Sequence, residues 1–290
     1  MEHVRWLADQ SLRAPTLVYA FTGWNDAGDA ASMAARTMIE QWGAAALAEI
    51  DPEPFTDFAT VRPHVRLNDG KRGIVWPTVG VWSAALPGGD VLLVLGPEPA
   101  LRWRLFCEQL VGIAERFSAP MTISLGALLA DVPHSRPVQI IGTATDPEMI
   151  DRFDLQRSRY EGPTGIVGVL QDALTTAGLA AASLWAAVPG YAAQVPSAKA
   201  ALALLERACA VMSASPPAGA LVGAAREYDA RVAAVIADDE DLMDYVTRLE
   251  SMLDDEADSD ADDDDSASLD PDSTDELVEK VERFLREHDA

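Results

Sequence analysis

The chain has 290 residues, of which 49% are hydrophobic, and a formal net charge of −25. This length and composition are sufficient for one large domain with a full hydrophobic core, or for one domain with an appendage. Nucleic acid and anionic membrane surfaces are both disfavoured, because binding to either depends on clusters of Lys and Arg. We therefore expect no nucleic-acid partner and no membrane partner.

The negative charge is unevenly distributed along the chain. Residues 1–237 carry 24 acidic and 18 basic residues, whereas residues 238–290 carry 23 acidic and 4 basic residues. The N-terminus has no basic segment followed by an apolar run, and the most apolar stretches are too short for a membrane span or are broken by Pro and Gly. We therefore expect a cytoplasmic protein, with Cys107 and Cys209 as buried, reduced thiols.

The first elements follow a strand–helix–strand pattern. Residues 16–21 (TLVYAF) form a short apolar run that is typical of a buried strand. A turn follows, in which Asn25 or Asp26 can cap a helix over about residues 27–42. Residues 44–50 are expected to form a second strand that pairs parallel to the first through a right-handed crossover.

A β-hairpin is predicted next. Residues 68–71 (NDGK) separate two apolar runs at 65–67 and 73–82. Asp-Gly suits the positive φ angles of a tight turn, so this pattern indicates a hairpin inserted on the α/β core. The loop before it, residues 51–63 (DPEPFTDFATVRP), contains Asp and Arg residues that can pair to hold the loop or a neighbouring subunit.

The remaining chain up to residue 237 alternates between strands and helices. The expected strands are 90–96, 121–127, 138–143 and 182–188, and the expected helices are 100–117, 164–177, 197–212 and 221–237. Such alternation predicts an α/β fold: a mixed, largely parallel sheet flanked by helices, with the inserted β-hairpin and C-terminal helices. We assign residues 1–237 to this α/β domain.

The C-terminal part is predicted to contain three segments. Residues 238–253 are typical of an acidic helix, and residues 254–272 of an acidic disordered linker, because nine of the twelve residues 254–265 are acidic and repel one another. Residues 273–290 are predicted to form a short amphipathic helix, which either docks on a partner or folds back onto the domain. Its candidate protein-binding face carries Leu277, Val281, Phe284 and Leu285.

Glycines and polar residues near the predicted strand ends outline a candidate ligand crevice. In an open α/β sheet, ligands bind outside the carboxyl ends of the strands. The turn at residues 23–28 (GWNDAG) lies there, but its spacing does not match a dinucleotide or phosphate loop, and Asp26 would repel phosphate. The simpler interpretation is a helix cap and a tight turn with Trp24 packed beneath it. The candidate ligand-binding residues are Gly23, Trp24, Asn25, Asp26, Gly96, Glu98, Gly126, Thr143, Gly162 and Gly165.

No catalytic residue, metal ligand or cofactor is predicted. Ser124 lies inside a strand without the preceding glycine of a nucleophile elbow, and the sequence has no zinc or acidic metal motif. His134, near Asp131, is either a general base or a loop residue that bonds the backbone. Gly162 and Gly165, at the start of a predicted helix, are compatible with an unusual turn or with an anion site.

Six segments of the chain match the pattern of a known family. They are VYAFTGWNDAGDAA at 18–31, DPEPFTDFATVRP at 51–63, LLVLGPEPALRW at 92–103, LGALLADVPHSRP at 125–137, YEGPTGIVGVL at 160–170 and AVPGYAAQVPSAKAALALL at 187–205. Together they resemble the PAC2 family, named for proteasome assembly chaperone 2, in its actinobacterial branch. The resemblance covers roughly residues 15–235.

This resemblance carries expectations about fold and partners. It implies a fold like that of phosphorylases and nucleoside hydrolases, and a protein that self-associates, with a trimer expected by analogy. Eukaryotic and archaeal relatives act as proteasome assembly factors, so proteasome subunits or another protein are the implied partners. Residues 286–290 (REHDA) do not match the hydrophobic–Tyr–any-residue tail by which some of those relatives dock on proteasome rings.

Two functions stay open from the sequence. The first is a non-catalytic, oligomeric, protein-binding scaffold of the assembly-chaperone type. The alternative is a small-molecule binder or enzyme that uses the crevice at the carboxyl ends of the strands. A deep pocket with a convergent acid–base pair would indicate the enzyme, whereas large apolar interfaces and a shallow crevice would indicate the scaffold.

Overall fold

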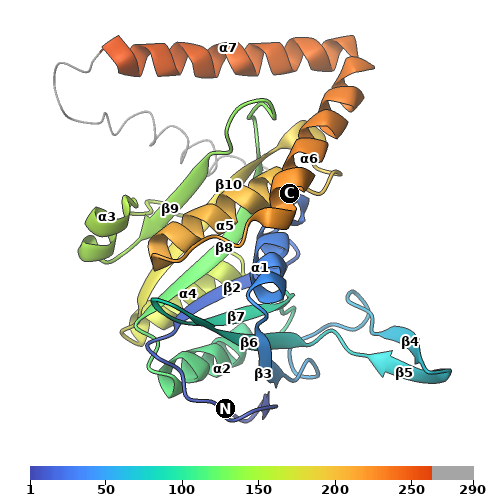
Figure 1. Ribbon diagram of the computed structural model, residues 1–290, viewed down its shortest axis with the longest axis vertical. Coiled ribbons are helices and arrows are strands. Elements are labelled where there is room, and N and C mark those ends of the chain that lie inside the picture. The colour runs from blue at the N-terminus through green and yellow to red at the C-terminus, as the bar shows by residue number, and fades with distance from the viewer. Residues whose placement is uncertain (263–290) are drawn as a thin grey trace.

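The computed structural model describes residues 1–262, and at its centre lies one sheet of eight strands (Figure 1). The strands lie in the order β1-β3-β6-β7-β2-β8-β10-β9. The four adjacent strands β7, β2, β8 and β10 run parallel, whereas the strands on either side of them pair antiparallel. The strand bounds are β1 Val4–Trp6, β2 Thr16–Thr22, β3 Ala45–Ile50, β6 Val79–Leu86, β7 Gly89–Pro97, β8 Met121–Ala130, β9 Ile140–Ala144 and β10 Ala180–Pro189.

Helices cover both faces of this sheet (Figure 1), so the expected α/β fold with a mixed sheet flanked by helices is confirmed. Helices α1 and α5 pack on one face, and α2 and α4 pack on the other. Each helix within residues 1–262 is either too short or too polar to span a lipid bilayer. The bounds are η1 Ala27–Asp29, α1 Ala30–Gln41, α2 Trp103–Arg116, α3 Pro147–Phe153, α4 Ile166–Thr176, η2 Gly190–Ala192, α5 Ala198–Met212, α6 Gly219–Ala237 and α7 Glu240–Asp262.

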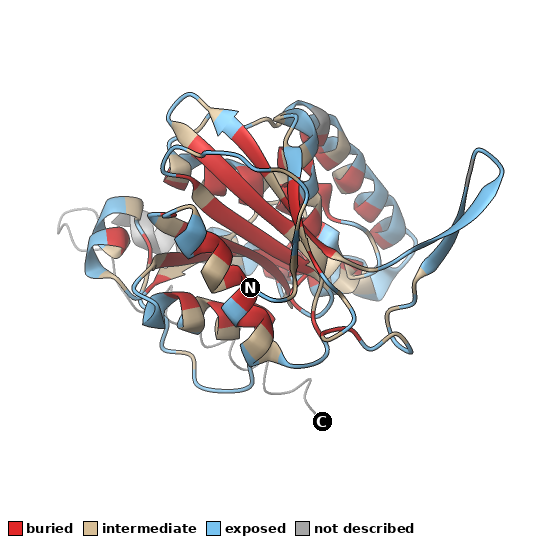
Figure 2. Ribbon diagram, turned by 90° about the horizontal axis from the view of Figure 1, so that it is seen from below, coloured by how far each residue is buried: buried red, intermediate tan, exposed pale blue. Residues whose placement is uncertain are grey.

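Strand β2 shows how one apolar run builds two cores. Successive side chains of a strand point to opposite faces of the sheet. Val18 and Ala20 therefore join the core under α1 and α5, whereas Leu17, Tyr19 and Phe21 join the core under α2 and α4. Figure 2 shows the central strands buried between the two helix layers.

The predicted hairpin is confirmed. Strands β4 (His64–Asn68) and β5 (Lys71–Val75) pair antiparallel and project away from the main sheet (Figure 1, Figure 2). The expected continuous strand over residues 73–82 is wrong, because pairing stops after Val75 and the chain enters the main sheet only at β6. Pro77 lies in this break, and it lacks the N–H group that a strand ladder requires.

The predicted pairing of the first two long strands is wrong. Strand β3 runs in the same direction as β2, but it lies between β1 and β6 and pairs antiparallel with both. Strands β6 and β7, which come later in the chain, occupy the places between β3 and β2. Strands that are consecutive in the chain are frequently neighbours in a sheet, but not always, because tertiary packing decides the strand order.

The N-terminal and C-terminal regions also differ from the prediction. Strand β1 and helix α3 are absent from the sequence-based assignment. Helix α7 continues past the expected end at residue 253, so residues 254–262 are helical rather than disordered. No Gly or Pro occurs in 254–262 to end the helix. The predicted linker beyond residue 262 and the predicted helix at 273–290 lie outside the described residues.

Helix α7 lies across the end of α6, away from the sheet (Figure 1). Val246 of α7 packs against Tyr228, Val232 and Ile236 of α6. The loop between β8 and β9 reaches up to α7 and forms side-chain contacts with it. These contacts are the 2.7 Å hydrogen bond from Tyr245 to Asp131, the hydrogen bond from Ser135 to Glu250 and the ion pair between Arg136 and Asp254.

Candidate functional site at the ends of the central strands

The turn after β2 supplies the first two side chains of the site. Asn25 and Asp26 are only 1% and 6% exposed, although both are polar. The N–H of Asp26 donates to the carbonyl oxygen of Gly23 over 3.1 Å, and the N–H of Ala127 in β8 donates to that of Asn25 over 2.9 Å. The turn thus continues the pairing of β2 with β8, and its two polar side chains point to opposite faces of the sheet.

Asn25 is held by Glu98, the first residue after β7. Its Nδ2 donates to Oε1 of Glu98 over 2.9 Å, and the same Oε1 accepts the N–H of Ile166, the first residue of α4, over 3.0 Å. One carboxylate therefore joins the turn after β2, the end of β7 and the start of α4. A carboxylate only accepts hydrogen bonds, so the Asn25 amide is oriented with Nδ2 toward Glu98. Among residues 1–262, no donor bonds to the buried Oδ1 of Asn25.

Gly165 provides the space that Asn25 occupies. A Cβ atom at this position would lie 2.5 Å from Oδ1 and 2.8 Å from Nδ2 of Asn25. Real Cβ atoms do not approach other atoms so closely, so a side chain here would displace Asn25. This contact explains why a glycine directly precedes α4. The alternative that this helix start binds an anion stays a prediction.

Asp26 points to the other face, toward α1. Its Oδ1 accepts the N–H of Ser32, in the first turn of α1, over 3.0 Å. The N-cap residue of α1 is Asp29 rather than the expected Asn25 or Asp26, because a short 3-10 turn at Ala27–Asp29 precedes the helix. Burial raises the pKa of Asp26 above its ordinary value of 3.8, although the hydrogen bonds from Ser32 act in the opposite direction. Its Oδ2 is buried and has no hydrogen-bond partner among the described residues.

A cavity of about 160 Å³ opens beside Asn25. The segment leading into α4 and strands β8, β9 and β10 supply its walls. Four of the predicted site residues line it: Trp24, Asn25, Thr143 and Gly165. The structure thus brings together predicted residues from three separate sequence segments, and whether they bind a ligand stays a prediction.

Trp24 is 50% exposed, so the prediction that it packs beneath the turn is wrong. Asn25 and Asp26 take the inward-facing places of the turn, which leaves the indole of Trp24 outside. Trp24 lines both the 160 Å³ cavity and a second hollow of about 590 Å³, to which Gly23 and Asp26 also contribute.

Four predicted residues line neither hollow. Glu98 acts through its bond to Asn25. Gly96, Gly126 and Gly162 permit close packing: a Cβ at each would lie 2.6 Å from Val79, Trp185 and Tyr160, respectively. Their role in the structure is therefore to admit a neighbouring group rather than to contact the cavity.

Several cavity residues are missing from the sequence-based site. Trp185, Tyr160 and Arg157 all line the 160 Å³ cavity. Trp185 in β10 lies directly opposite Gly126 in β8. A glycine inside a buried strand often marks the close approach of a large group, so Gly126 was the available signal for an aromatic neighbour. The sequence does not indicate which aromatic residue this is.

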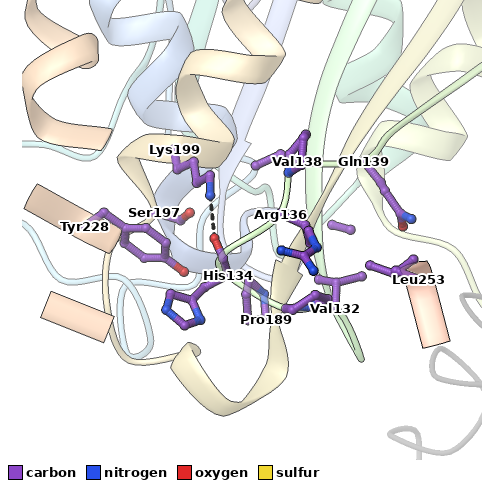
Figure 3. A pocket seen from close by; sticks show the side chains of 13 residues that line it. Val132, His134, Arg136, Val138, Gln139, Pro189, Ser197, Lys199, Tyr228 and Leu253 are labelled. Carbon is purple, nitrogen blue, oxygen red and sulfur yellow. Dashed lines mark hydrogen bonds between the residues drawn. The ribbon is translucent and has the colours of Figure 1, made fainter. Parts of the chain in front are cut away.

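His134 lies apart from this crevice, in a small pocket shown in Figure 3. Its N–H donates to Oη of Tyr191 over 2.7 Å, and its Nδ1 lies 3.1 Å from the same oxygen. Lys199 donates to the carbonyl oxygen of His134 (Figure 3). Lys199 also pairs with Asp229 over 3.1 Å. Burial lowers the pKa of His134. The pocket measures about 20 Å³, close to the space of one water molecule, which favours the loop-residue interpretation.

The remaining candidates for reactive chemistry are the two cysteines. Both Cys107 and Cys209 are free and buried, as expected. Burial raises the pKa of Cys107 to about 11 and that of Cys209 to about 12, so both are neutral thiols at pH 7. Among the side chains that the structure describes, which end at residue 254, no three His, Cys, Asp or Glu groups gather in a way that could hold a metal ion. The predicted docking residues Leu277, Val281, Phe284 and Leu285 lie outside the described residues.

The fold and the site together define an open α/β protein in which a hydrogen-bonded Asn–Glu pair links the ends of β2 and β7 to the start of α4. The PAC2 family pattern matches residues 20–236, and the chain belongs to the PAC2 family. No functionally curated protein matches it.

Solved structures agree with this assignment. A PAC2 family protein from Streptomyces avermitilis is 43% identical, with a TM-score of 0.75 over 80% of this chain and 99% of the other. A proteasome-assembly chaperone homologue from Mycobacterium tuberculosis is 41% identical, with a TM-score of 0.73 over the same shares. PbaB of Pyrococcus furiosus, an archaeal proteasome activator, is 16% identical, with a TM-score of 0.67 over 80% of this chain and 97% of its own, and shares the fold.

Proposed function

We propose that this protein is an oligomeric, protein-binding scaffold of the assembly-chaperone type, with proteasome subunits among its partners. The 41% identity to a proteasome-assembly chaperone homologue supports the chaperone-type role and the class of partner. The buried, unpaired thiols fit the reducing cytoplasm, which we propose as its compartment.

The observation that carries the binding role is the projecting hairpin of β4 and β5. In its register, Val65 lies opposite Ile74, and Leu67 lies opposite Arg72. Val65, Leu67 and Ile74 therefore share one face of the ribbon. All three are exposed, and Leu67 is 72% exposed. A two-stranded ribbon on its own is marginally stable in water, and such an apolar face is typical of an interaction surface.

The charge of the hairpin indicates what kind of surface covers it. Residues 62–76 contain Arg62, Arg66, Lys71 and Arg72 but only one acidic residue, whereas the whole chain has a net charge of −25. A basic, apolar ribbon fits an acidic partner surface. A second copy of this acidic chain supplies such a surface, so the hairpin supports self-association, and a trimer is the assembly that we propose.

Light scattering after size-exclusion chromatography tests the self-association. We expect the wild-type protein to elute at a multiple of its 31.0 kDa mass, with three copies as the proposed number. The double variant Leu67→Glu/Ile74→Glu should lose mass, because it places two charges in the apolar face. The control is Leu7→Glu, which changes a leucine near the N-terminus that is 43% exposed, close to the 50% exposure of Ile74. A monomeric wild type would contradict the oligomer, and an unchanged mass in the double variant would exclude the hairpin as its contact.

The predicted C-terminal helix would supply a second docking element. The sequence of this predicted helix is amphipathic, and an acidic stretch joins the helix to the domain. We propose that it docks on a protein partner as a helix in a groove. Comparison of partner binding by the full chain and by a chain that ends at residue 262 tests this role.

A further inference from the structure

We propose that the cavity beside Asn25 binds a small aromatic acid whose ring carries a hydrogen-bond donor. This ligand site goes beyond the protein-binding role, and it uses a different part of the molecule. The argument depends on the orientation of Asn25, on the size and walls of the cavity and on the charge at its lining.

Asn25 indicates which hydrogen-bonding group the ligand carries. Its Nδ2 is taken by Glu98 over 2.9 Å, so the free atom is the acceptor Oδ1. The residue is 1% exposed, and no donor among residues 1–262 satisfies Oδ1. Buried acceptors in native proteins are paired with very few exceptions. Because Asn25 lines the cavity, an occupant with an N–H or O–H group supplies the missing donor.

The walls and the volume indicate a single aromatic ring. Trp24, Trp185 and Tyr160 line the cavity, together with the apolar side chains of Leu128 and Ile141. Aromatic walls favour a planar, polarisable occupant through offset stacking or edge-to-face contacts. The cavity measures about 160 Å³, and an engineered apolar cavity of about 150 Å³ is large enough to bind benzene. One water molecule would leave most of this space empty.

The charge of the lining favours an anionic substituent. Arg157 is the one charged residue among those that line the cavity within residues 1–262. Its Nη2 donates to the carbonyl oxygen of Thr145 over 3.2 Å, which positions the guanidinium and leaves further N–H groups for a ligand. A carboxylate on the ring would pair with them, and a guanidinium recognises a carboxylate through two parallel hydrogen bonds.

The test uses 4-hydroxybenzoate and 4-aminobenzoate as probes and 4-fluorobenzoate as the matched probe without a donor. Binding is measured on the full chain by isothermal titration calorimetry and by ligand-observed saturation-transfer NMR. We expect both donor probes to bind, and 4-fluorobenzoate to bind about tenfold more weakly, because it leaves Asn25 Oδ1 unpaired. No saturation transfer to either donor probe at about 5 mM, or equal affinity for all three probes, would overturn the proposal.

Variants locate the binding in the cavity. Trp24→Ala should weaken 4-hydroxybenzoate binding by about tenfold, since it removes one aromatic wall. The control Trp76→Ala changes a tryptophan of nearly equal exposure, 48%, on the projecting hairpin. Arg157→Gln should also weaken binding, whereas Arg226→Gln on α6 should not. Unchanged affinity in both Trp24→Ala and Arg157→Gln would overturn the site. The light-scattering mass, measured in parallel, reports the oligomer separately, so failure of either proposal is recognised on its own.

Discussion

Asn25 and Glu98 lie 73 residues apart in the chain, yet Nδ2 of Asn25 donates to Oε1 of Glu98 over 2.9 Å just beyond the carboxyl ends of the central strands β2 and β7. The same Glu98 oxygen accepts the first backbone N–H of α4. Two of the parallel strands and one helix therefore depend on a single carboxylate for their junction.

Glu98→Ala should lower the free energy of unfolding by about 2–4 kcal/mol, because it leaves the buried Nδ2 of Asn25 and the N–H of Ile166 without an acceptor. Urea denaturation measures this change. The control is Glu53→Ala, which removes an exposed carboxylate from the loop after β3. Equal stability of the two variants would show that the Asn25–Glu98 bond does not hold the junction.

Gly165→Ala should destabilise the protein by about 1–3 kcal/mol, because the new Cβ would lie 2.5 Å from Asn25 Oδ1 and force it to move. Gly223→Ala in α6 is the matched control. No atom lies within 4 Å of the Cβ position there, so the same chemical change should stabilise the helix by up to about 1 kcal/mol. Thermal denaturation of both variants compares them directly, and a neutral effect at residue 165 would contradict the close contact.

Asp26→Asn should raise the melting temperature at pH 7. Burial raises the pKa of Asp26 in the folded state above 3.8, so its ionisation opposes folding. The stability of the wild type therefore falls as pH rises from 3.8 through the raised pKa, and it stays lower above that value. The side chain at this position of the variant cannot ionise, so the variant should not lose this stability. Each kcal/mol of retained stability should raise the melting temperature by about 2–4 °C.

The difference in melting temperature between Asp26→Asn and the wild type isolates this group from the other carboxylates. It should be largest at neutral pH and should vanish as the pH falls below 3.8, where Asp26 is protonated in both states. If the difference in melting temperature between the two proteins did not change between pH 3 and pH 7, Asp26 would not titrate with a raised pKa. A pKa that is one unit higher in the folded state corresponds to about 1.4 kcal/mol of folding free energy.

Local patterns in the sequence predicted most elements of the fold. The apolar run at residues 90–96 became β7, and the Asp69–Gly70 turn became the projecting hairpin. Both features depend on neighbouring residues alone. The pairing of β3 with β6 could not be predicted in this way, since it depends on strands that come later in the chain.

In the candidate site too, the sequence predicted local features but not those that depend on the tertiary structure. The sequence placed Asn25, Glu98 and Gly165 near the strand ends, and the structure brings all three into contact. It did not predict that Trp24 faces outward, because the exposure of a turn residue depends on which of its neighbours fill the interior. Trp185 was missed because its partner Gly126 becomes informative only when the register of β8 and β10 is known.

Trp24→Ala should change the free energy of unfolding by only about 1 kcal/mol, since half of the side chain is already exposed. Phe21→Ala, at a fully buried position of the preceding strand β2, should cost about 3–5 kcal/mol. Urea denaturation of the pair measures the contrast. A loss of several kcal/mol in Trp24→Ala would show that the indole is packed after all.

We propose that this chain is a protein-binding scaffold of the assembly-chaperone type, a role that requires surfaces for protein partners. Tagged full-length protein and a tagged chain ending at residue 262 are each purified by affinity from cells of the organism that encodes them. Mass spectrometry then identifies the proteins that copurify with each chain. We expect to recover proteasome subunits with the full-length chain, and to recover fewer of them with the shorter chain because it lacks the C-terminal segment proposed to dock. Failure of both chains to recover proteasome subunits above an untagged control would contradict the proposed partnership.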